Sequence, residues 1–315
     1  MKTPNSRLRT PNLFMPRDYR KMAMGLIKGR TLYDTPMKRF TSMKVGGPAD
    51  SLLYPKDIVE LKKVVRYATK NDIPILILGN GTNLVVRDNG IRGWVVSLTQ
   101  GMKDIQWDGD VVEAGSGLAL QRLVHLSVRK GFSGLEPFSG IPGTVGGGLA
   151  MNAGAWGKEL KDILLSITLM NEEGEVVEKP RQNLKFSYRR LAFPSSWIIL
   201  RGRFQLEKGR KEEILERVRF YGEKRRRTQP LNYPSAGSVF KNPAEGPAGK
   251  WIEEAGLKGV RMGQAMVSER HANFIVNLGK AKAQDVIHLM EWVKRKIYEE
   301  KGISLQREVR VVGEP

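Results

Sequence analysis

A glycine-rich run is the stretch of the sequence whose residue types point most directly to chemistry. Residues 141–157 read IPGTVGGGLAMNAGAWG. Glycine has no Cβ, so such a run can turn successive backbone N–H groups toward a bound anion, while Thr144 adds a hydroxyl donor and Asn152 an amide. The run predicts a loop that holds an anionic ligand, although a tight structural loop would use the same residues. The glycines concerned are Gly143, Gly146, Gly147 and Gly148.

Another glycine-rich loop lies earlier in the chain and follows the apolar residues 73–78, which read as a buried strand. A strand followed by a glycine-rich turn is a common place to hold phosphate. Neither GxGxxG nor GxxxxGK[ST] occurs, because Leu84 stands where the third glycine would be. Two separated loops therefore predict a long diphosphate cofactor that is held in another way. The first loop along the chain consists of Gly79, Asn80, Gly81, Thr82 and Asn83, and the run at 141–157 forms the second.

Hydrophobic periodicity predicts the elements that must position these loops, and together they indicate an α+β fold with mixed sheets. In the last predicted strand, apolar and polar residues alternate, so Glu308 and Arg310 are expected on one polar face. A strand with one face in water would look the same. The predicted helices span 57–67, 119–130, 212–225, 248–256 and 282–300. The predicted strands span 73–78, 93–98, 110–114, 167–170, 176–177, 197–206, 273–278 and 303–311.

Shifts in composition divide the chain into three parts. Residues 1–30 are rich in Lys and Arg and are expected to form a loosely ordered basic extension. Residues 31–207 are expected to form a cofactor domain with two subdomains, about 31–98 and 99–207. A polar stretch near 207–212 marks the predicted boundary to a C-terminal domain over 208–315.

Composition also limits the function. The chain has 315 residues, no cysteine, three histidines and a formal net charge of +20. The lack of cysteine excludes disulfides, thiolate metal sites and cysteine nucleophiles, and no metal site is expected. No apolar run approaches the roughly 18 residues that span a bilayer, and no signal-peptide pattern precedes the domain, so a cytoplasmic protein without membrane insertion is expected.

The basic charge has several explanations. A solvated basic face or arm would account for it, as would a nucleic acid, an anionic membrane surface or a polyanionic small substrate. No RNA-recognition, helix-turn-helix or zinc-finger pattern accompanies the charge, so nucleic acid is not expected as a partner.

Five motifs in one order give the chain a family resemblance. They read GNGTNLVV (79–86), SGIPGTVGGGLAMNAGAWG (139–157), FSYR (186–189), AGSVFKNP (236–243) and REVRVVG (307–313). Together they resemble the UDP-N-acetylenolpyruvoylglucosamine reductase family. The resemblance implies an FAD-binding domain of the vanillyl-alcohol-oxidase (PCMH) type and a separate C-terminal α+β substrate domain. It also implies NADPH-dependent reduction of an enolpyruvyl ether to UDP-N-acetylmuramate in peptidoglycan precursor synthesis, and hence a part in cell shape and division.

The resemblance also assigns roles to residues. Ser238 would donate the proton, Glu308 would support the enolate, and Arg189 would stabilise the developing charge. As a donor, Glu308 must be protonated, which requires a pKa raised by burial. Taken alone, Ser238 is ordinary turn chemistry and Arg189 an ordinary surface residue. The expected substrate-binding residues are Tyr188, Lys241, Asn242 and Arg310.

The resemblance implies that both glycine-rich loops bind FAD, noncovalently because no Cys and no nearby His could attach it. NADPH would reduce the flavin before the sugar nucleotide enters, and the protein is expected to be a monomer. Besides Gly79, Asn80, Gly81, Thr82 and Asn83, the expected FAD-binding residues are Gly140, Ile141, Pro142, Gly143, Thr144, Gly146, Gly147, Asn152 and Gly154.

One departure and two alternatives remain. The spacing between Arg189 and Ser238 is short, which resembles the second structural class of the family, without the inserted lobe and its substrate-clamping tyrosine. Another flavoenzyme of the same fold, such as a 2-hydroxy-acid oxidase, would share both glycine-rich loops. A basic nucleic-acid-binding protein would bind no flavin and would bind in a steeply salt-dependent way.

Overall fold

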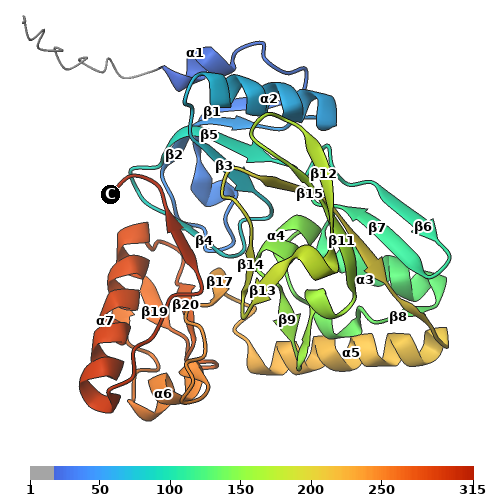
Figure 1. The fold of residues 1–315 in the computed structure, drawn as a ribbon. Coiled ribbons are helices and arrows are strands. Elements are labelled where there is room, and N and C mark those ends of the chain that lie inside the picture. Colours follow the sequence, from blue (N-terminus) through green and yellow to red (C-terminus); the bar gives the residue numbers. More distant parts are fainter. Residues whose placement is uncertain (1–17) are drawn as a thin grey trace, which may run out of the picture.

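The computed structural model describes residues 18–315. In Figure 1, two sheets occupy the upper and right parts, and a smaller C-terminal unit, coloured orange to red, lies beside them. The predicted α+β class with mixed sheets is confirmed. Within the described residues, no helix is long and apolar enough to cross a membrane, and no group of three potential metal ligands occurs.

The first sheet has the strand order β1-β2-β5-β3, with β1 antiparallel and the other three parallel. Helix α2 (Ile58–Lys70), predicted over 57–67, begins after its N-cap Asp57, whose carboxylate accepts from Glu60 N at 2.8 Å. Its apolar face packs with Trp94 and Val96 of β5. The strands are β1 (Thr31–Pro36), β2 (Pro48–Leu53), β5 (Ile91–Ser97) and β3 (Ile75–Leu78).

Residues 18–30 pack on this sheet, so the expectation of a loosely ordered extension is wrong for them; residues 1–17 lie outside the described part. Helix α1 (Tyr19–Ala23) is fixed where Trp94 Nε1 donates to Tyr19 O at 2.8 Å. The buried Glu60 carboxylate accepts from the backbone N–H of Lys28, Gly29 and Lys56 at 2.9–3.1 Å. Burial alone raises the pKa of Glu60, but these amides outweigh it and hold the pKa below its usual value.

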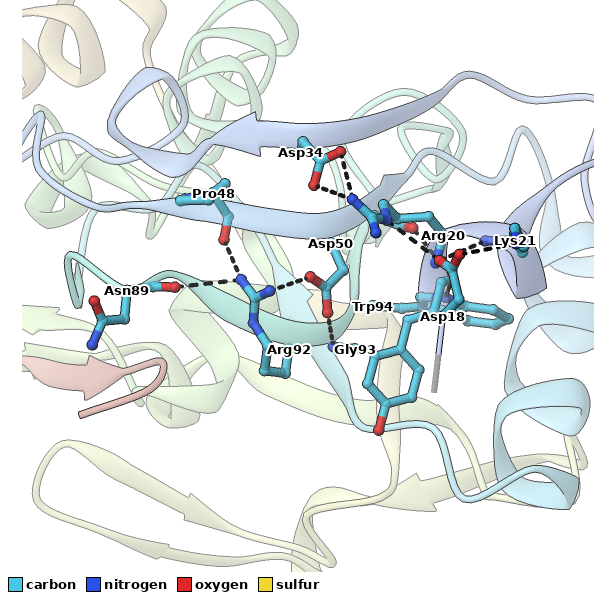
Figure 2. A network of polar contacts seen from close by, with 12 residues as sticks. Asp18, Arg20, Lys21, Asp34, Pro48, Asp50, Asn89, Arg92, Gly93 and Trp94 are labelled. Atoms are coloured by element: carbon cyan, nitrogen blue, oxygen red, sulfur yellow. Dashed lines mark hydrogen bonds and ion pairs between the residues drawn. The ribbon is translucent and has the colours of Figure 1, made fainter. Parts of the chain in front are cut away.

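A network of polar contacts that links β1, β2 and β5 of this sheet to the N-terminal segment, drawn in Figure 2, is structural. Asp50 is buried, and its carboxylate lies 2.6 Å from Arg92 Nη1 and accepts from Gly93 N at 2.9 Å. Arg20 joins Asp18 of the N-terminal segment to Asp34 of β1. Since these acids are satisfied by the fold, they are not candidates for chemistry.

The second sheet is antiparallel throughout, in the order β12-β11-β15-β7-β6. Strands β11 and β12 form a hairpin, and in its turn Asn171 Oδ1 accepts from Glu173 N and Glu175 N. Helix α3 (Leu120–Lys130) ends as predicted at Gly131, which has φ +74°. The strands are β12 (Val176–Pro180), β11 (Leu164–Met170), β15 (Ile198–Gln205), β7 (Val111–Gly115) and β6 (Ile105–Asp108).

Helix α5 (Lys211–Thr228) lies with the second sheet (Figure 1). Arg217 on α5 holds the buried Glu136 carboxylate, with Nη2 at 2.8 Å, and Val218 packs into the core of this part. The boundary at 207–208 stays a prediction, and the packing of α5 favours one near Gln229. Short pairs complete this region: β9 (Gly154–Ala155) with β10 (Lys158–Glu159), β13 (Lys185–Ser187) with β14 (Arg190–Ala192), and β8 (Phe132–Ser133) with β16 (Glu207–Lys208).

The C-terminal unit packs helices α6 (Ala248–Glu254) and α7 (Ala283–Lys301) on a third, antiparallel sheet. Strand β21 (Arg310–Val312) leaves this unit and pairs in parallel with β4 (Leu84–Val86), directly after the first glycine-rich loop. This pairing brings the last residues of the chain beside that loop. The sheet consists of β17 (Ser235–Ser238), β20 (Phe274–Asn277), β19 (Ala265–Val267) and β18 (Arg261–Met262).

The predicted strand over 303–311 is wrong in its extent. Ile303, Leu305 and Val309 are buried, as the alternation predicts, but regular pairing begins only at Arg310. Residues 303–309 instead cross the end of β17, where they make one isolated bridge, between Arg307 and Phe240. Burial of alternate residues therefore arises without a strand ladder.

Candidate active site

The two glycine-rich loops lie against each other. A Cβ on Gly79 would lie 2.7 Å from Thr144 Oγ1, and one on Gly143 would lie 3.2 Å from Thr82 Oγ1. Beside the first loop is a cavity of about 500 Å³. Its walls include residues that the sequence did not single out, which carry no recognisable motif: Arg39, Phe40, Thr41, Ser42, Lys44, Tyr54, Ser97 and Thr99.

The first loop keeps backbone donors available. Within residues 18–315, the N–H groups of Asn80, Gly81 and Thr82 donate to no protein acceptor. Gly81 has φ +62°, and a Cβ there would lie 2.1 Å from Phe40 O, so only glycine fits. Asn83, in contrast, has a protein partner for its side chain, since its Nδ2 donates to Glu308 O at 3.2 Å. Free amides beside a cavity fit a diphosphate.

The second loop does not present its amides as predicted. Residues 145–150 form helix α4, so Gly148 N donates to Thr144 O at 2.8 Å and Gly147 N to the Thr144 hydroxyl at 3.2 Å. Gly146 N donates to Ser116 O at 2.9 Å. The expectation that these three N–H groups face an anion is wrong, since the helix and its neighbour take them. A Cβ on Gly146 would lie only 2.6 Å from Ser116 Cβ, so the close packing against Ser116 explains why residue 146 is a glycine.

Gln121 fixes the start of the second loop. Its Oε1 accepts from Gly140 N at 2.8 Å, and its Nε2 donates to Ile141 O at 3.0 Å, while Thr82 Oγ1 lies 3.5 Å from Pro142 O. Farther along, Asn152 has φ +41° and is fully buried. Its Nδ2 donates to Ser187 O, and its Oδ1 accepts from Lys161 N. Because the side chain already has these protein partners, a direct contact of Asn152 with a cofactor stays a prediction.

The structure brings Arg189 and Glu308 together. Arg189 stands at the tip of the β13–β14 hairpin with φ +57°, and its Nε lies 3.2 Å from Glu308 Oε1. A Cβ on Gly154 would lie 3.0 Å from Arg189 Nη1, so this glycine makes room for the guanidinium. Arg189 Cζ also lies 5.0 Å from the centroid of the half-exposed Tyr188 ring.

The environment of Glu308 favours its protonated form. Burial raises the pKa of this carboxyl above its usual value, and the positive charges of Arg189 and Lys241 only partly oppose that effect. The side chain is 15% exposed. Glu308 is therefore protonated to a larger extent near neutral pH than an ordinary glutamate, as the expected donor role requires.

Ser238 lies next to the Glu308 segment. It ends β17 after a bulge, in which Gly237 has φ +77° and no atom lies within 4 Å of where its Cβ would be. Glu308 N donates to Val239 O at 2.8 Å, so the residue after Ser238 is bonded directly to Glu308. A bulge re-aims side chains at the end of a strand, which accounts for the placement of the serine.

Two expected substrate-binding residues are placed differently from the rest. Asn242 Oδ1 accepts from Ala248 N at 3.0 Å, which ties it to the start of α6. Arg310 is exposed and forms no ion pair within the described residues, while Glu308 lies before the strand and is partly buried, so their shared polar face stays a prediction. Lys241 is half-buried, and its charge acts on Glu308.

Arg225 is a candidate anion-binding residue that no motif in the sequence marks. It is 8% exposed, its Nη1 donates to Gln229 Oε1 at 3.1 Å, and its buried Nε has no partner. Burial and the positive charge of Arg189 lower the pKa of Arg225 to about 10, so it stays charged at neutral pH. No acid pairs with it in the described part of the chain. The helical spacing Ile214, Val218, Tyr221, Arg225 was the available signal.

Comparisons with known proteins cover nearly the whole chain. Residues 49–179 match the FAD binding domain, and residues 229–312 match the C-terminal domain of UDP-N-acetylenolpyruvoylglucosamine reductase. The reductase of Syntrophus aciditrophicus (strain SB) is 46% identical over 293 residues, covering 91% of this chain and 94% of that protein. That of Caldanaerobacter subterraneus subsp. tengcongensis is 42% identical over 290 residues, covering 92% and 96%.

A solved structure agrees with these matches. The crystal structure of UDP-N-acetylenolpyruvylglucosamine reductase from Thermus caldophilus superposes with a TM-score of 0.76 at 37% identity, covering 90% of this chain and 99% of that one. The expected FAD-binding domain and separate C-terminal domain are confirmed. With relatives above 40% identity over nine-tenths of its length, the chain belongs to the UDP-N-acetylenolpyruvoylglucosamine reductase family.

Proposed function

We propose that this chain reduces the enolpyruvyl ether of UDP-N-acetylglucosamine enolpyruvate to the lactyl ether of UDP-N-acetylmuramate, a peptidoglycan precursor. NADPH is the electron donor and FAD the bound cofactor. The observation that carries the proposal is the Arg189–Glu308 pair, with Nε and Oε1 3.2 Å apart, because Glu308 N also donates to the carbonyl of Val239, the residue after Ser238. Family membership supports the reaction, and the FAD binding domain supports the cofactor.

The residues present fit FAD. The free N–H groups of Asn80, Gly81 and Thr82 would hold its diphosphate, and Gly79 and Gly143 let the two glycine-rich loops approach each other beside these donors. When bound there and reduced by NADPH, FAD would supply the hydride for the terminal carbon of the enolpyruvyl group. Everything else in the reaction falls to the protein.

Three side chains have distinct tasks. Hydride addition leaves negative charge on the carbon that bears the carboxylate and on that carboxylate, where the Arg189 guanidinium provides a planar pair of donors. Protonated Glu308 donates a hydrogen bond to the same enolate. The Ser238 hydroxyl then gives its proton to the carbanionic carbon, completing the addition of one hydride and one proton across the double bond.

Substrate binding is proposed for the other expected residues, which lie near Arg189 and Glu308 or next to them in the chain. Lys241 adds positive charge beside Glu308, and the exposed ring of Tyr188 lies over Arg189. Asn242 and Arg310 border this region along the chain. As the family resemblance implies, NADPH would bind and leave before the UDP-sugar enters the same site.

An anaerobic absorbance titration tests the proposal. NADPH should bleach the flavin band of the purified protein, and UDP-N-acetylglucosamine enolpyruvate should restore it. A protein that bleaches but is not reoxidised by this compound would be another flavoenzyme. A protein that cannot be loaded with FAD would overturn the assignment entirely.

Replacing Arg225 by methionine should stabilise the protein without FAD and weaken FAD binding. Removing a buried charge without a counter-charge should raise the Tm of the flavin-free protein by about 2 °C or more. The Tm increase on loading with FAD should shrink, because Arg225 lies across Gly140 of the second loop, with Cδ 2.8 Å from the position of a Cβ. Thermal melts with and without FAD measure both effects.

The exposed neighbour provides the control for this prediction. Arg226→Met should change neither Tm. If Arg225→Met lowered the Tm of the flavin-free protein and left the gain from FAD intact, the guanidinium would be a structural group and not an anion site.

A further inference from the structure

Asn273 is a buried side chain that holds the segment after Ser238. It precedes β20 and is 4% exposed. Its Oδ1 accepts from Phe240 N at 2.9 Å, and its Nδ2 donates to Phe240 O at 2.8 Å. Its backbone carbonyl accepts from Val239 N at 2.9 Å. One residue therefore satisfies three backbone groups in the two positions that follow Ser238.

The other side of this segment bears Glu308. Val239 O accepts from Glu308 N at 2.8 Å, Phe240 forms an isolated bridge with Arg307, and Lys241 N donates to Gln306 O at 2.9 Å. The segment that begins at Ser238 is thus held between Asn273 on one side and the chain around Glu308 on the other.

A side chain is needed here because the strand ladder stops. Pairing of β17 with β20 ends at Ser238 and Phe274, after a bulge. Phe240 is 2% exposed, so its N–H and C=O would lose their partners without being reached by water. The carboxamide of asparagine carries one acceptor and one donor side by side, as a peptide group does, and takes the place of the missing strand.

We propose that Asn273 is a positioning residue for proton transfer: its side-chain amide clamps Phe240, while its backbone carbonyl holds Val239, and the clamp fixes the Ser238 hydroxyl relative to the Glu308 carboxyl. The proposal rests on the proposed function, since it concerns the same site. Asn273 itself touches neither the substrate nor the reacting atoms. Small displacements of catalytic groups slow a reaction strongly, so loss of the clamp should act on the step that uses both groups.

The two half-reactions separate positioning from folding. Reduction of the flavin by NADPH does not use the proton of Ser238, whereas reoxidation by the enolpyruvyl sugar does. In Asn273→Ala, reoxidation at saturating sugar nucleotide should slow tenfold or more, with its KM within about threefold. Flavin reduction should stay within about twofold of the wild type. Asn273→Ser, which retains a hydroxyl that can bond one Phe240 group, should lie between the two.

Asn171 gives a matched control. It is also buried and also holds backbone N–H groups with its Oδ1, but in the turn between β11 and β12. Asn171→Ala should lower the Tm by an amount comparable to Asn273→Ala and change neither half-reaction.

Other outcomes overturn the proposal in distinguishable ways. Equal loss of both half-reactions in Asn273→Ala and Asn273→Ser, or normal reoxidation in both, would make Asn273 a structural residue only. A wild-type protein that is reduced but not reoxidised by the sugar nucleotide would instead overturn the proposed function, before any variant is compared.

Discussion

Replacing Ser238 by alanine should leave reduction of the flavin by NADPH intact while slowing reoxidation by UDP-N-acetylglucosamine enolpyruvate by about 10²–10⁴-fold. Alanine keeps the backbone of the bulge before residue 238, and no other hydroxyl stands at this position. Hydride addition would still be possible, but the enolate would lack its proton donor. Stopped-flow absorbance of each half-reaction measures the two rates separately.

Ser235 supplies the control, because it lies on the same strand and is also half-buried. Ser235→Ala should leave both half-reactions near the wild-type rates. If Ser238→Ala slowed reduction and reoxidation equally, the hydroxyl would support the fold of the site and the proton donor would have to be another group.

Local sequence signals predicted those parts of the fold that local chemistry decides. Asp57 caps α2 and Gly131 ends α3, as their residue types indicate, and the turn after β11 is held by Asn171. These features depend on a few neighbouring residues, so periodicity and capping preferences suffice. Each was predictable without knowledge of the rest of the chain.

Features that depend on partners distant in the sequence were not predictable in this way. The N–H group of Gly146 donates to Ser116 O, and that of Gly148 donates within helix α4. The high glycine content of this segment gave no indication that it forms a helix. The alternation of apolar and polar residues over 303–311 predicted correctly which of them are buried. Pairing into a sheet also requires a neighbouring strand, and β4 pairs only from Arg310 onward. Burial of Arg225 depends on α5 packing beside Gly140.

The candidate site was likewise predictable from the sequence only in part. Motif resemblance selected Arg189, Ser238 and Glu308, but a sequence contains no distances, and the 3.2 Å approach of Arg189 to Glu308 required the fold. The requirement for a raised pKa of Glu308 followed from its expected role, whereas its cause, burial, is a property of the assembled structure. Asn273 had no motif to mark it, since its importance lies in which backbone groups it meets.

Glu308→Gln should slow reoxidation by about 10²-fold or more and remove part of its pH dependence. In the wild type, burial raises the pKa of Glu308, and the protonated carboxyl is the form that donates to the enolate. As the pH rises through this raised pKa, the proton is lost and the rate of reoxidation should fall. The carboxylate that forms would also pair with Arg189, 3.2 Å away, and compete with the substrate carboxylate for the guanidinium. Both effects act in the same direction.

The glutamine variant separates these effects from folding. Glutamine does not ionise, so the falling alkaline limb of the reoxidation rate should disappear in Glu308→Gln, while reduction by NADPH stays near the wild-type rate. Glu254→Gln, an exposed change on α6, should retain the wild-type rate and profile. If the limb persisted in Glu308→Gln, another group would control it. If turnover were normal, Glu308 would have no part in the chemistry, and the Arg189–Glu308 pair would be a structural ion pair.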